Sequence, residues 1–297
     1  LSCIPVHVTD LEVLPDNYIL ELDVVNDTDT TRIVTTEDFR IRNKTNNNYL
    51  TINESKKIFP PCSKTNMYID FARLRPKIGN TIPGEQLKLN AEFSVRTAKD
   101  NSMFNVVSKC AYGNTIDSIK ATEVWDDHEN KIRAEGLTAE ELDIQKRNFY
   151  LLDANRYFKP DSFDFVIQSV GVYENNDIVK KSCQILHDRL VELVQMIDSN
   201  MVLVKPSETT MDYSYDIVLE NEDYTIGKIL EYVLYEKYFV DQKKLSFCGF
   251  KKVHPHDNDS VIRVAYTQVT DKQMVLQQLR DVCITSSEVF SKLYKMF

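Results

Sequence analysis

The histidine and cysteine side chains are the first candidates for chemistry in this sequence. His254 and His256 flank a proline and could ligate a metal ion, but no further Cys or His follows at the spacing of a zinc site, so we interpret them as part of a turn. The six cysteines are scattered, without a Cys-x-x-Cys pair: Cys3, Cys62, Cys110, Cys183, Cys248 and Cys283. We therefore expect no bound metal, and we expect free thiols in a reducing, intracellular compartment.

Catalytic groups are the next candidates. His128 stands among the carboxylates of Asp126, Asp127 and Glu129, which could exchange protons only if burial or a close partner shifted a pKa. Because this run is polar, a solvated surface is the preferred interpretation. Cys248 would need a nearby histidine to act as a nucleophile, and a buried cysteine on a strand is the simpler interpretation.

Loops that hold phosphates or activate a serine are missing from the chain. There is no Gly-x-Gly-x-x-Gly, no Walker loop and no Gly-x-Ser-x-Gly, and the 297 residues include only seven glycines. The sequence therefore predicts no catalytic residues and no cofactor.

The overall charge argues against broad contact with nucleic acid. The net charge is −9 and the pI is near 5.2, whereas a surface that binds many phosphates is normally basic. No run approaches the roughly 20 apolar residues that cross a bilayer. The chain opens in an apolar stretch, residues 1–8, without an initiator Met, so we expect a further segment upstream.

The first part of the chain, to about residue 113, has the pattern of strands. Every second residue is apolar from Leu87 to Val95, as in a half-buried strand, and shorter candidates cover Tyr18–Val25 and Arg32–Thr36. From Asp117 to Arg147 the composition is polar, which predicts a connector or a solvated helix. Thr138 and Glu141 have the spacing of a capping box within it.

A strand and an amphipathic helix follow. The strand is expected over residues 162–169, and the helix over 177–198, with apolar residues repeating every three or four positions. Residues 200–213 resemble a linker. Beyond them we expect a strand near 215–219, a helix over 225–236 capped by Thr225, and strands over 245–252 and 260–267.

The chain closes with a predicted helix over residues 271–296, for which Thr270 and Gln273 could form a capping box. Its apolar side chains follow alternating spacings of three and four, which is typical of a helix that packs along another helix. These residues are Leu276, Leu279, Cys283, Ser286, Phe290, Leu293 and Phe297. The helix over 177–198 is the candidate partner, because both carry an apolar face too wide to leave in water.

Several segments of the first half resemble the third-largest subunit of eukaryotic RNA polymerase. The opening Leu-Ser-Cys-Ile-Pro-Val is similar to the segment that introduces that family's insertion domain, and residues 83–91, Pro-Gly-Glu-Gln-Leu-Lys-Leu-Asn-Ala, resemble its Gly-Gln-Glu-Leu strand. The turn that follows departs from the family, with Asp100 to Phe104 where His-Ala-Lys-aromatic is usual. The zinc-binding cysteines of many relatives are also absent.

The resemblance is stronger from residue 162 onward. Residues 163–171 are similar to the family's Phe-x-Val-Glu-Ser-Val-Gly, with Gln168 in place of the acidic residue, and a dimerisation helix follows. Residues 223–230, Asp-Tyr-Thr-Ile-Gly-Lys-Ile-Leu, resemble the His-Thr-Leu-Gly-Asn-Leu motif of the smaller partner, the eleventh subunit of RNA polymerase II. Residues 249–255 resemble that partner's Gly-Tyr-x-x-Pro-His-Pro turn.

This resemblance implies an α+β fold in which two modules similar to the bacterial polymerase α subunit form an intrachain pseudo-dimer beside a sheet-rich insertion module. The expected domains are 1–115 for the insertion module, 116–200 for the first dimerisation module with its connector, and 201–297 for the second, smaller-partner-like module. The implied assembly and dimerisation residues are Gly171, Ile178, Ile185, Leu186, Leu190, Thr225, Gly227, Ile229, Leu230, Leu279 and Phe290.

The implied function is that of a non-catalytic platform for assembling a DNA-directed RNA polymerase. Its partners would be the two large catalytic subunits and small assembly subunits, with no membrane and little direct nucleic-acid contact. A fused pair resembles the arrangement in large nucleocytoplasmic DNA viruses, which would place the protein in the host cytoplasm and the virion. Two alternatives stay open at this point, a stand-alone intracellular protein-binding module and a cysteine enzyme with an unrecognised triad.

Overall fold

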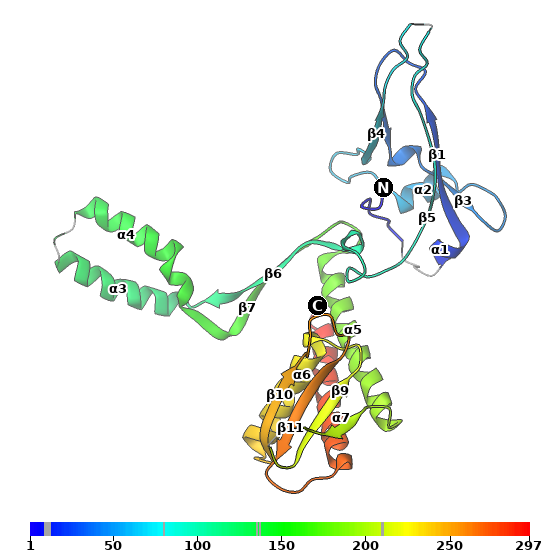
Figure 1. Cartoon of the computed structure of the whole chain (residues 1–297). Coiled ribbons are helices and arrows are strands. Elements are labelled where there is room, and N and C mark those ends of the chain that lie inside the picture. Colours follow the sequence, from blue (N-terminus) through cyan, green and yellow to red (C-terminus); the bar gives the residue numbers. More distant parts are fainter. Residues whose placement is uncertain (9–12, 80, 135, 137, 209–210) are drawn as a thin grey trace. The chain divides into compact units, whose positions relative to one another are not determined.

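The computed structural model describes residues 1–8, 13–79, 81–134, 136, 138–208 and 211–297. The chain forms two compact units, Leu1–Glu174 and Asn175–Phe297, each with its own hydrophobic core (Figure 1). The boundaries predicted at residues 115 and 200 stay a prediction. Each unit is described by itself below.

The first unit begins with a small antiparallel sheet of order β3-β1-β5 and a separate β2-β4 ladder. The sheet strands are β1 (Tyr18–Val25), β3 (Arg40–Asn43) and β5 (Gln86–Glu92), and the ladder pairs β2 (Arg32–Thr35) with β4 (Asp70–Leu74). Alternate residues of β1 point inward, and Leu20, Leu22 and Val24 are buried with Ile41 and Val34. The strands predicted near residues 18, 32 and 87 are thus present, because alternation puts one face of each on the core.

Short helical segments complete this part of the first unit. They are α1 (Val13–Asn17), α2 (Ile52–Ile58) and the 3₁₀ turns η1 (Thr36–Asp38) and η2 (Ser102–Phe104). The Thr51 hydroxyl accepts from the Glu54 amide and the Glu54 carboxylate accepts from the Thr51 amide, so a capping box starts α2.

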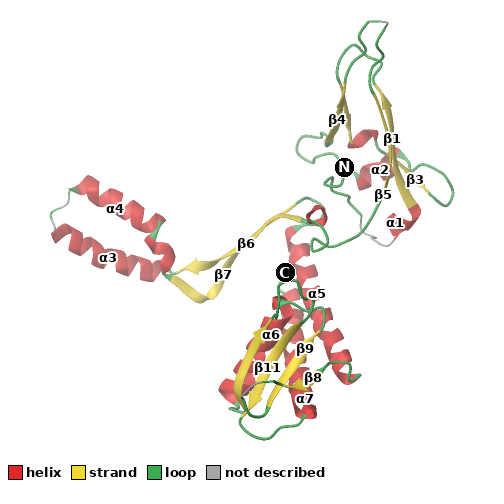
Figure 2. Cartoon of the chain, viewed as in Figure 1, coloured by secondary structure: helices red, strands yellow, loops and turns green. Residues whose placement is uncertain are grey.

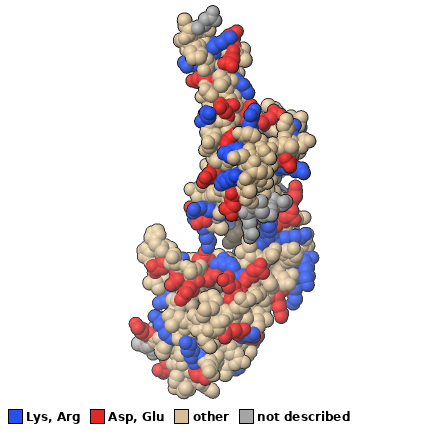
Figure 3. Space-filling view, turned by 90° about the vertical axis from the view of Figure 1, so that its right-hand side faces the viewer, with Lys and Arg blue, Asp and Glu red and all other residues tan. Residues whose placement is uncertain are grey.

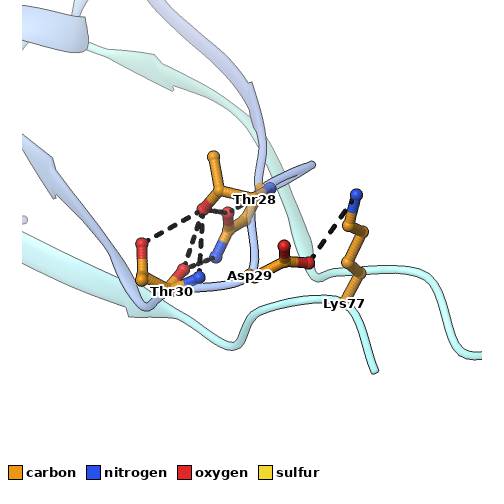
Figure 4. A network of polar contacts seen from close by, with 5 residues as sticks. Thr28, Asp29, Thr30 and Lys77 are labelled. Atoms are coloured by element: carbon orange, nitrogen blue, oxygen red, sulfur yellow. Dashed lines mark hydrogen bonds and ion pairs between the residues drawn. The ribbon is translucent and has the colours of Figure 1, made fainter. Parts of the chain in front are cut away.

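A buried asparagine organises the turn after β1. The Asn26 side-chain amide donates to the carbonyls of Thr30 and Leu74 at 2.9 and 3.0 Å, and its Oδ1 accepts from the backbone and hydroxyl of Thr28. Lys77 and Asp29 form an ion pair at 3.7 Å on the outside of the turn (Figure 4). Because every polar atom of the Asn26 side chain is satisfied, the residue can be fully buried.

The polar segment after residue 117 is a helical hairpin, which corrects its interpretation as a connector or a single helix. Helices α3 (Ser118–Ala134) and α4 (Ala139–Leu151) pack on one another, and η3 (Asp153–Arg156) follows (Figure 2). The capping box of Thr138 and Glu141 is confirmed. Trp125 and Phe149 are buried between the helices. A few aromatic side chains thus form a small core, although the composition of the segment is polar on average.

The hairpin is carried by a two-stranded antiparallel ribbon of β6 (Val107–Ile116) and β7 (Phe158–Ser169). The strand predicted over 162–169 is therefore longer and begins before Pro160. On the ribbon the Tyr112 ring contacts the rings of Phe163 and Phe165, and all three side chains are largely exposed. Gly171 follows β7 with φ of 103°, a left-handed conformation that favours glycine.

The second unit is a four-stranded antiparallel sheet of order β10-β11-β9-β8, with helices that bury one of its faces (Figure 1). Its strands are β8 (Val204–Pro206), β9 (Ser214–Leu219), β10 (Leu245–Lys251) and β11 (Ser260–Tyr266). Its helices are α5 (Asn175–Asp198), α6 (Tyr224–Leu234), the π-helical turn η4 (Tyr235–Asp241) and α7 (Lys272–Tyr294). The predicted linker thus contains a short edge strand, β8, while its residues 209–210 lie outside the described residues.

Two helix starts differ from the prediction. The cap of α6 is Asp223, whose carboxylate accepts from the Thr225 amide at 3.0 Å, so Thr225 lies inside the helix. The cap of α7 is Asp271, which accepts from the Met274 amide at 2.9 Å in place of the expected Thr270 and Gln273 box. In both cases an aspartate one or two residues away competes successfully, because a carboxylate is a strong acceptor for free helix amides.

The close approach of Gly84 to the Asn26 turn generates a first prediction. A Cβ atom at Gly84 would lie 1.7 Å from the Asn26 carbonyl oxygen, and the backbone there is held by the bond from the Asn26 amide to the Glu85 carbonyl. Gly84→Ala should therefore lower the free energy of unfolding by about 1–3 kcal/mol, as overpacking does. Chemical denaturation followed by circular dichroism would measure it.

Gly113→Ala is the matched control, because Gly113 lies in β6 of the same unit and a Cβ there would meet nothing within 4 Å. If the two substitutions changed stability equally, the packing at Gly84 would not be as described.

Candidate assembly interface

The long helices α5 and α7 lie along one another within the second unit. Their facing side chains repeat every three or four residues, so one stripe of each helix is removed from water. The stripe of α5 contains Leu190, Leu193 and Ile197, and that of α7 contains Leu279 and Cys283. Fully burying a Leu or Ile contributes about 1.5–3 kcal/mol, so this seam is a large part of the stabilisation of the unit.

An ion pair joins the same two helices. The guanidinium of Arg280 on α7 donates to both oxygens of Asp198 at the end of α5, at 2.7 and 3.2 Å. These hydrogen bonds hold the pKa of Asp198 below its usual value. Because both side chains are about half exposed, the pair orients the helices more than it stabilises them.

The sheet covers another side of α7. Ile217, Ile262 and Val264 point from the sheet into the core, and Leu230 of α6 is fully buried among them. The Tyr266 hydroxyl donates to the Gln278 side-chain oxygen at 2.8 Å inside this core. A buried hydrogen bond of this kind fixes the rotation of α7 on the sheet, since leaving either group unpaired is costly.

The strongest local constraint on α6 is the contact of Gly227 with the Phe250 ring. A Cβ at Gly227 would lie 1.9 Å from a ring carbon of Phe250, so the ring lies closer to the α6 backbone than a larger residue would permit. The next turn of α6 is held by Glu231, whose carboxylate accepts from the Phe250 amide at 3.0 Å and pairs with Lys228. The register predicts an exposed Glu231, and this is wrong: its side chain is 18% exposed and satisfies the edge of β10.

The π-helical turn η4 also binds α7. The Tyr238 hydroxyl donates to Asp281 at 2.6 Å, and Lys237 pairs with the same carboxylate at 2.5 Å. Hydrogen bonds from Lys237 and then from Tyr238 hold the pKa of Asp281 below its usual value, whereas burial raises the pKa of Tyr238. Two consecutive residues of the π-helical turn thus bind one carboxylate of α7.

The predicted assembly residues fall into three groups. Leu190, Gly227, Leu230 and Leu279 are buried, and Ile178, Leu186, Ile229 and Phe290 are partly buried. Gly171, Ile185 and Thr225 are exposed, and Gly171 lies in the first unit. Whether any of them contacts another subunit stays a prediction.

Two residues that were expected on the buried apolar stripes are exposed to water in the structure. Ile185 is 58% exposed, and Cys183 takes the inward position two residues earlier, because two residues turn a helix by about 200°. Phe297 is 52% exposed, beyond the end of α7. The spacing of three and four also leaves out Val275 and Val282. Both are buried, because α7 packs on the sheet as well as on α5 and so needs a wider apolar face.

The groups considered for catalysis or metal binding have structural partners. Glu129 accepts from the Trp125 indole at 2.7 Å and from Arg133, and these bonds, Arg133 first, lower its pKa. His254 and His256 form an exposed turn in which the His256 amide donates to His254 Nδ1 at 3.1 Å. Within the described ranges, no cluster of three or more His, Cys, Asp or Glu side chains could hold a metal ion.

Cys248 is not arranged as a nucleophile. Burial raises the pKa of its thiol to about 12, and its sulfur lies 3.7 Å from the Glu231 carbonyl oxygen, which cannot take part in activating it. A thiol of this kind stays protonated at neutral pH. Cys248 therefore lacks the surroundings that activate a catalytic thiol.

Most of the second unit is similar to one known protein family. Residues 214–293 match the family described as the RNA polymerase Rpb3/Rpb11 dimerisation domain, which spans β9 through nearly all of α7. Residues 214–293 are thus similar to an RNA polymerase dimerisation domain of the α-subunit-like type. A comparison with curated proteins yields no significant match. No helix in the described residues is long and apolar enough to cross a membrane.

The Gly227 contact generates a second prediction. Alanine normally favours a helix over glycine by about 1 kcal/mol, but here the new methyl group would meet the Phe250 ring. We expect Gly227→Ala to destabilise the second unit by about 1–3 kcal/mol in denaturant unfolding. In a Phe250→Ala background the same change should be neutral or stabilising, and additivity of the two substitutions would contradict the contact.

The burial of the thiols generates a third prediction. Hydrogen bonds from the Thr65 side chain and then its backbone lower the pKa of the exposed Cys62 to about 7, whereas burial raises the pKa of Cys283 to about 12. With a maleimide reagent followed by mass spectrometry, Cys62 should react first. Its rate should rise with pH, reach about half of its maximum near pH 7, where half of the thiol is ionised, and level off at higher pH. Rapid labelling of Cys283 in the folded chain would show that the α5–α7 seam is open.

Proposed function

We propose that this protein is a non-catalytic assembly subunit of a DNA-directed RNA polymerase, and that it holds the two large catalytic subunits together through one fused platform. The observation that carries the proposal is the match of residues 214–293 to the Rpb3/Rpb11 dimerisation domain. The family name links this fold to polymerase subunits that pair with one another. Small assembly subunits are further proposed partners.

The packing of α5 supports the idea that the pairing occurs within one chain. By sequence resemblance α5 is the dimerisation helix of the larger partner, and it precedes the matched region. It nevertheless shares a continuous core with α7, and the Arg280 to Asp198 ion pair links the two. Two chains that pair at such a seam lose translational freedom on binding, whereas a fused chain has already lost it.

The chemistry of the chain fits a platform better than a catalyst. Two of the groups considered for catalysis have structural roles: Glu129 binds the Trp125 indole, and burial keeps the Cys248 thiol protonated. The net charge of −9 disfavours extensive direct contact with nucleic acid, and acidic and basic side chains both occur over the face drawn in Figure 3. Viral origin, packaging in the virion and location in the host cytoplasm are further parts of the proposal that the sequence resemblance supports.

The alternative function is a stand-alone intracellular protein-binding module. It would use the same folded unit without the large subunits. Tagging the chain in its own cells and identifying what purifies with it by mass spectrometry separates the two, because only the polymerase platform should recover two very large subunits.

A fourth prediction tests the shared core and the function together. Leu230 has no exposed surface, so Leu230→Asp would remove packing worth about 2–5 kcal/mol and bury an unpaired carboxylate. Because a domain has about 5–15 kcal/mol of net stability, the second unit should loosen, its melting temperature should fall and the large subunits should no longer be recovered.

Two controls accompany this variant. Leu230→Met keeps the volume and should retain both stability and recovery, at a cost below about 1.5 kcal/mol. Tyr232→Asp introduces the same charge on the same helix at a side chain that is 65% exposed, and should leave the melting temperature nearly unchanged. Unaltered melting and recovery for Leu230→Asp would remove the main support for the fused platform.

A further inference from the structure

A groove outside the α5–α7 seam lies in the second unit, between the carboxyl-terminal half of α5 and the end of β9. It encloses about 280 Å³. Its apolar lining includes Met196, Met201, Leu203 and Val218. Met201 and Leu203 are 60% and 49% exposed, so the groove presents flexible apolar side chains to the solvent.

The end of α5 builds one wall of this groove. Asn200 adopts a left-handed φ of 54°, its amide donates to the Ile197 carbonyl at 3.0 Å, and the Met201 amide donates to the Met196 carbonyl at 2.9 Å. These two bonds form a Schellman motif, in which the residues at Met196 and Met201 characteristically make an apolar contact. The methionines are therefore held side by side by backbone hydrogen bonds, although their side chains are flexible.

The rim of the groove is acidic. Its charged residues are Glu192, Glu220, Glu222 and Arg189, and the last two pair with each other, with Arg189 Nε 3.2 Å from Glu222 Oε1. Glu192 and Glu220 are exposed, and neither forms an ion pair with another residue in the described part of the chain. The lining thus carries two carboxylates in excess around an apolar floor.

We propose that this groove docks a cationic, apolar peptide segment of a partner protein. One aliphatic or aromatic side chain of the segment would lie against Met196, Met201 and Leu203, and flanking Lys or Arg side chains would lie beside Glu192 and Glu220. The charge complementarity argues for this occupant, because an acidic rim attracts cations and repels acidic segments.

The other occupants fit less well. At about 280 Å³ the groove lies at the lower end of the range typical of small-molecule sites, and a space of this size suits one or two side chains. A second copy of this chain carries a net charge of −9, so it would bring further negative charge to an acidic rim. The whole lining of the groove belongs to the second unit, so the docking does not require assembly into a polymerase.

The test measures binding of a fluorescein-labelled peptide, Gly-Lys-Lys-Leu-Phe-Lys-Lys-Gly, to the full chain by fluorescence anisotropy. Two matched peptides replace the four lysines with glutamates, or the Leu-Phe pair with glycines. We expect saturable binding of the first peptide alone. Its affinity should fall when the salt is raised from about 0.05 M to about 0.5 M, because salt screens the attraction between the lysines and the carboxylates of the rim.

Variants identify the groove. Glu192→Lys with Glu220→Lys should weaken binding by about tenfold or more, and Leu203→Asp should do the same through the apolar floor. Glu236→Lys with Glu288→Lys makes the same change in net charge at two exposed residues outside the groove, and should leave binding within about twofold. All the substituted side chains are exposed, and equal melting temperatures would show that the variants fold.

Three results would overturn the proposal. The first is equal affinity for the glutamate peptide and the lysine peptide. The second is an unchanged affinity of the groove variants for the lysine peptide. The third is no detectable binding of any of the peptides. Light scattering that showed a dimer of this chain, abolished by Leu203→Asp, would also overturn it, since the occupant would then be a second copy.

Discussion

The second unit depends on the simultaneous burial of α7 against α5 and against the sheet. A helix that packs on one neighbour needs a single apolar stripe, but α7 buries adjacent positions such as Leu279, Val282 and Cys283 together. Since burial of apolar area supplies most of the driving force for folding, these contacts make α5, α7 and the sheet one cooperative body. Removing α5 would expose a seam that no other described element of the unit covers.

Polar contacts give this apolar core its register. Gln278 with Tyr266, Asp281 with Tyr238 and Lys237, and Arg280 with Asp198 all start from α7 and reach three different elements. Each contributes little net free energy, because the same groups bond to water in the unfolded chain. The Gln278 and Tyr266 pair nevertheless disfavours other rotations of α7, since a shifted helix would leave these two buried groups unpaired.

The family match covers only part of the core of the second unit, because the preceding helix α5 lies outside it. Residues 214–293 carry the family assignment, whereas α5 lies outside them and completes their core. In the fused platform that we propose, α5 would occupy the seam at which a separate partner could otherwise pair. The other surfaces of the unit, including the acidic groove beside Met201, would then be available to other partners.

The sequence by itself determined the elements whose signals are local. Alternation predicted β1 and β5, three-and-four spacing predicted α5 and α7, and the Thr138 and Glu141 pair predicted a helix start, because each pattern involves residues within a few positions of one another. The tertiary structure alone decided what depends on distant residues. It turned Ile185 outward and Cys183 inward, bound Glu231 to the amide of Phe250, and paired α3 with α4 around Trp125. In each case the outcome was set by which neighbour packs on the element, and a local pattern holds no information about that neighbour.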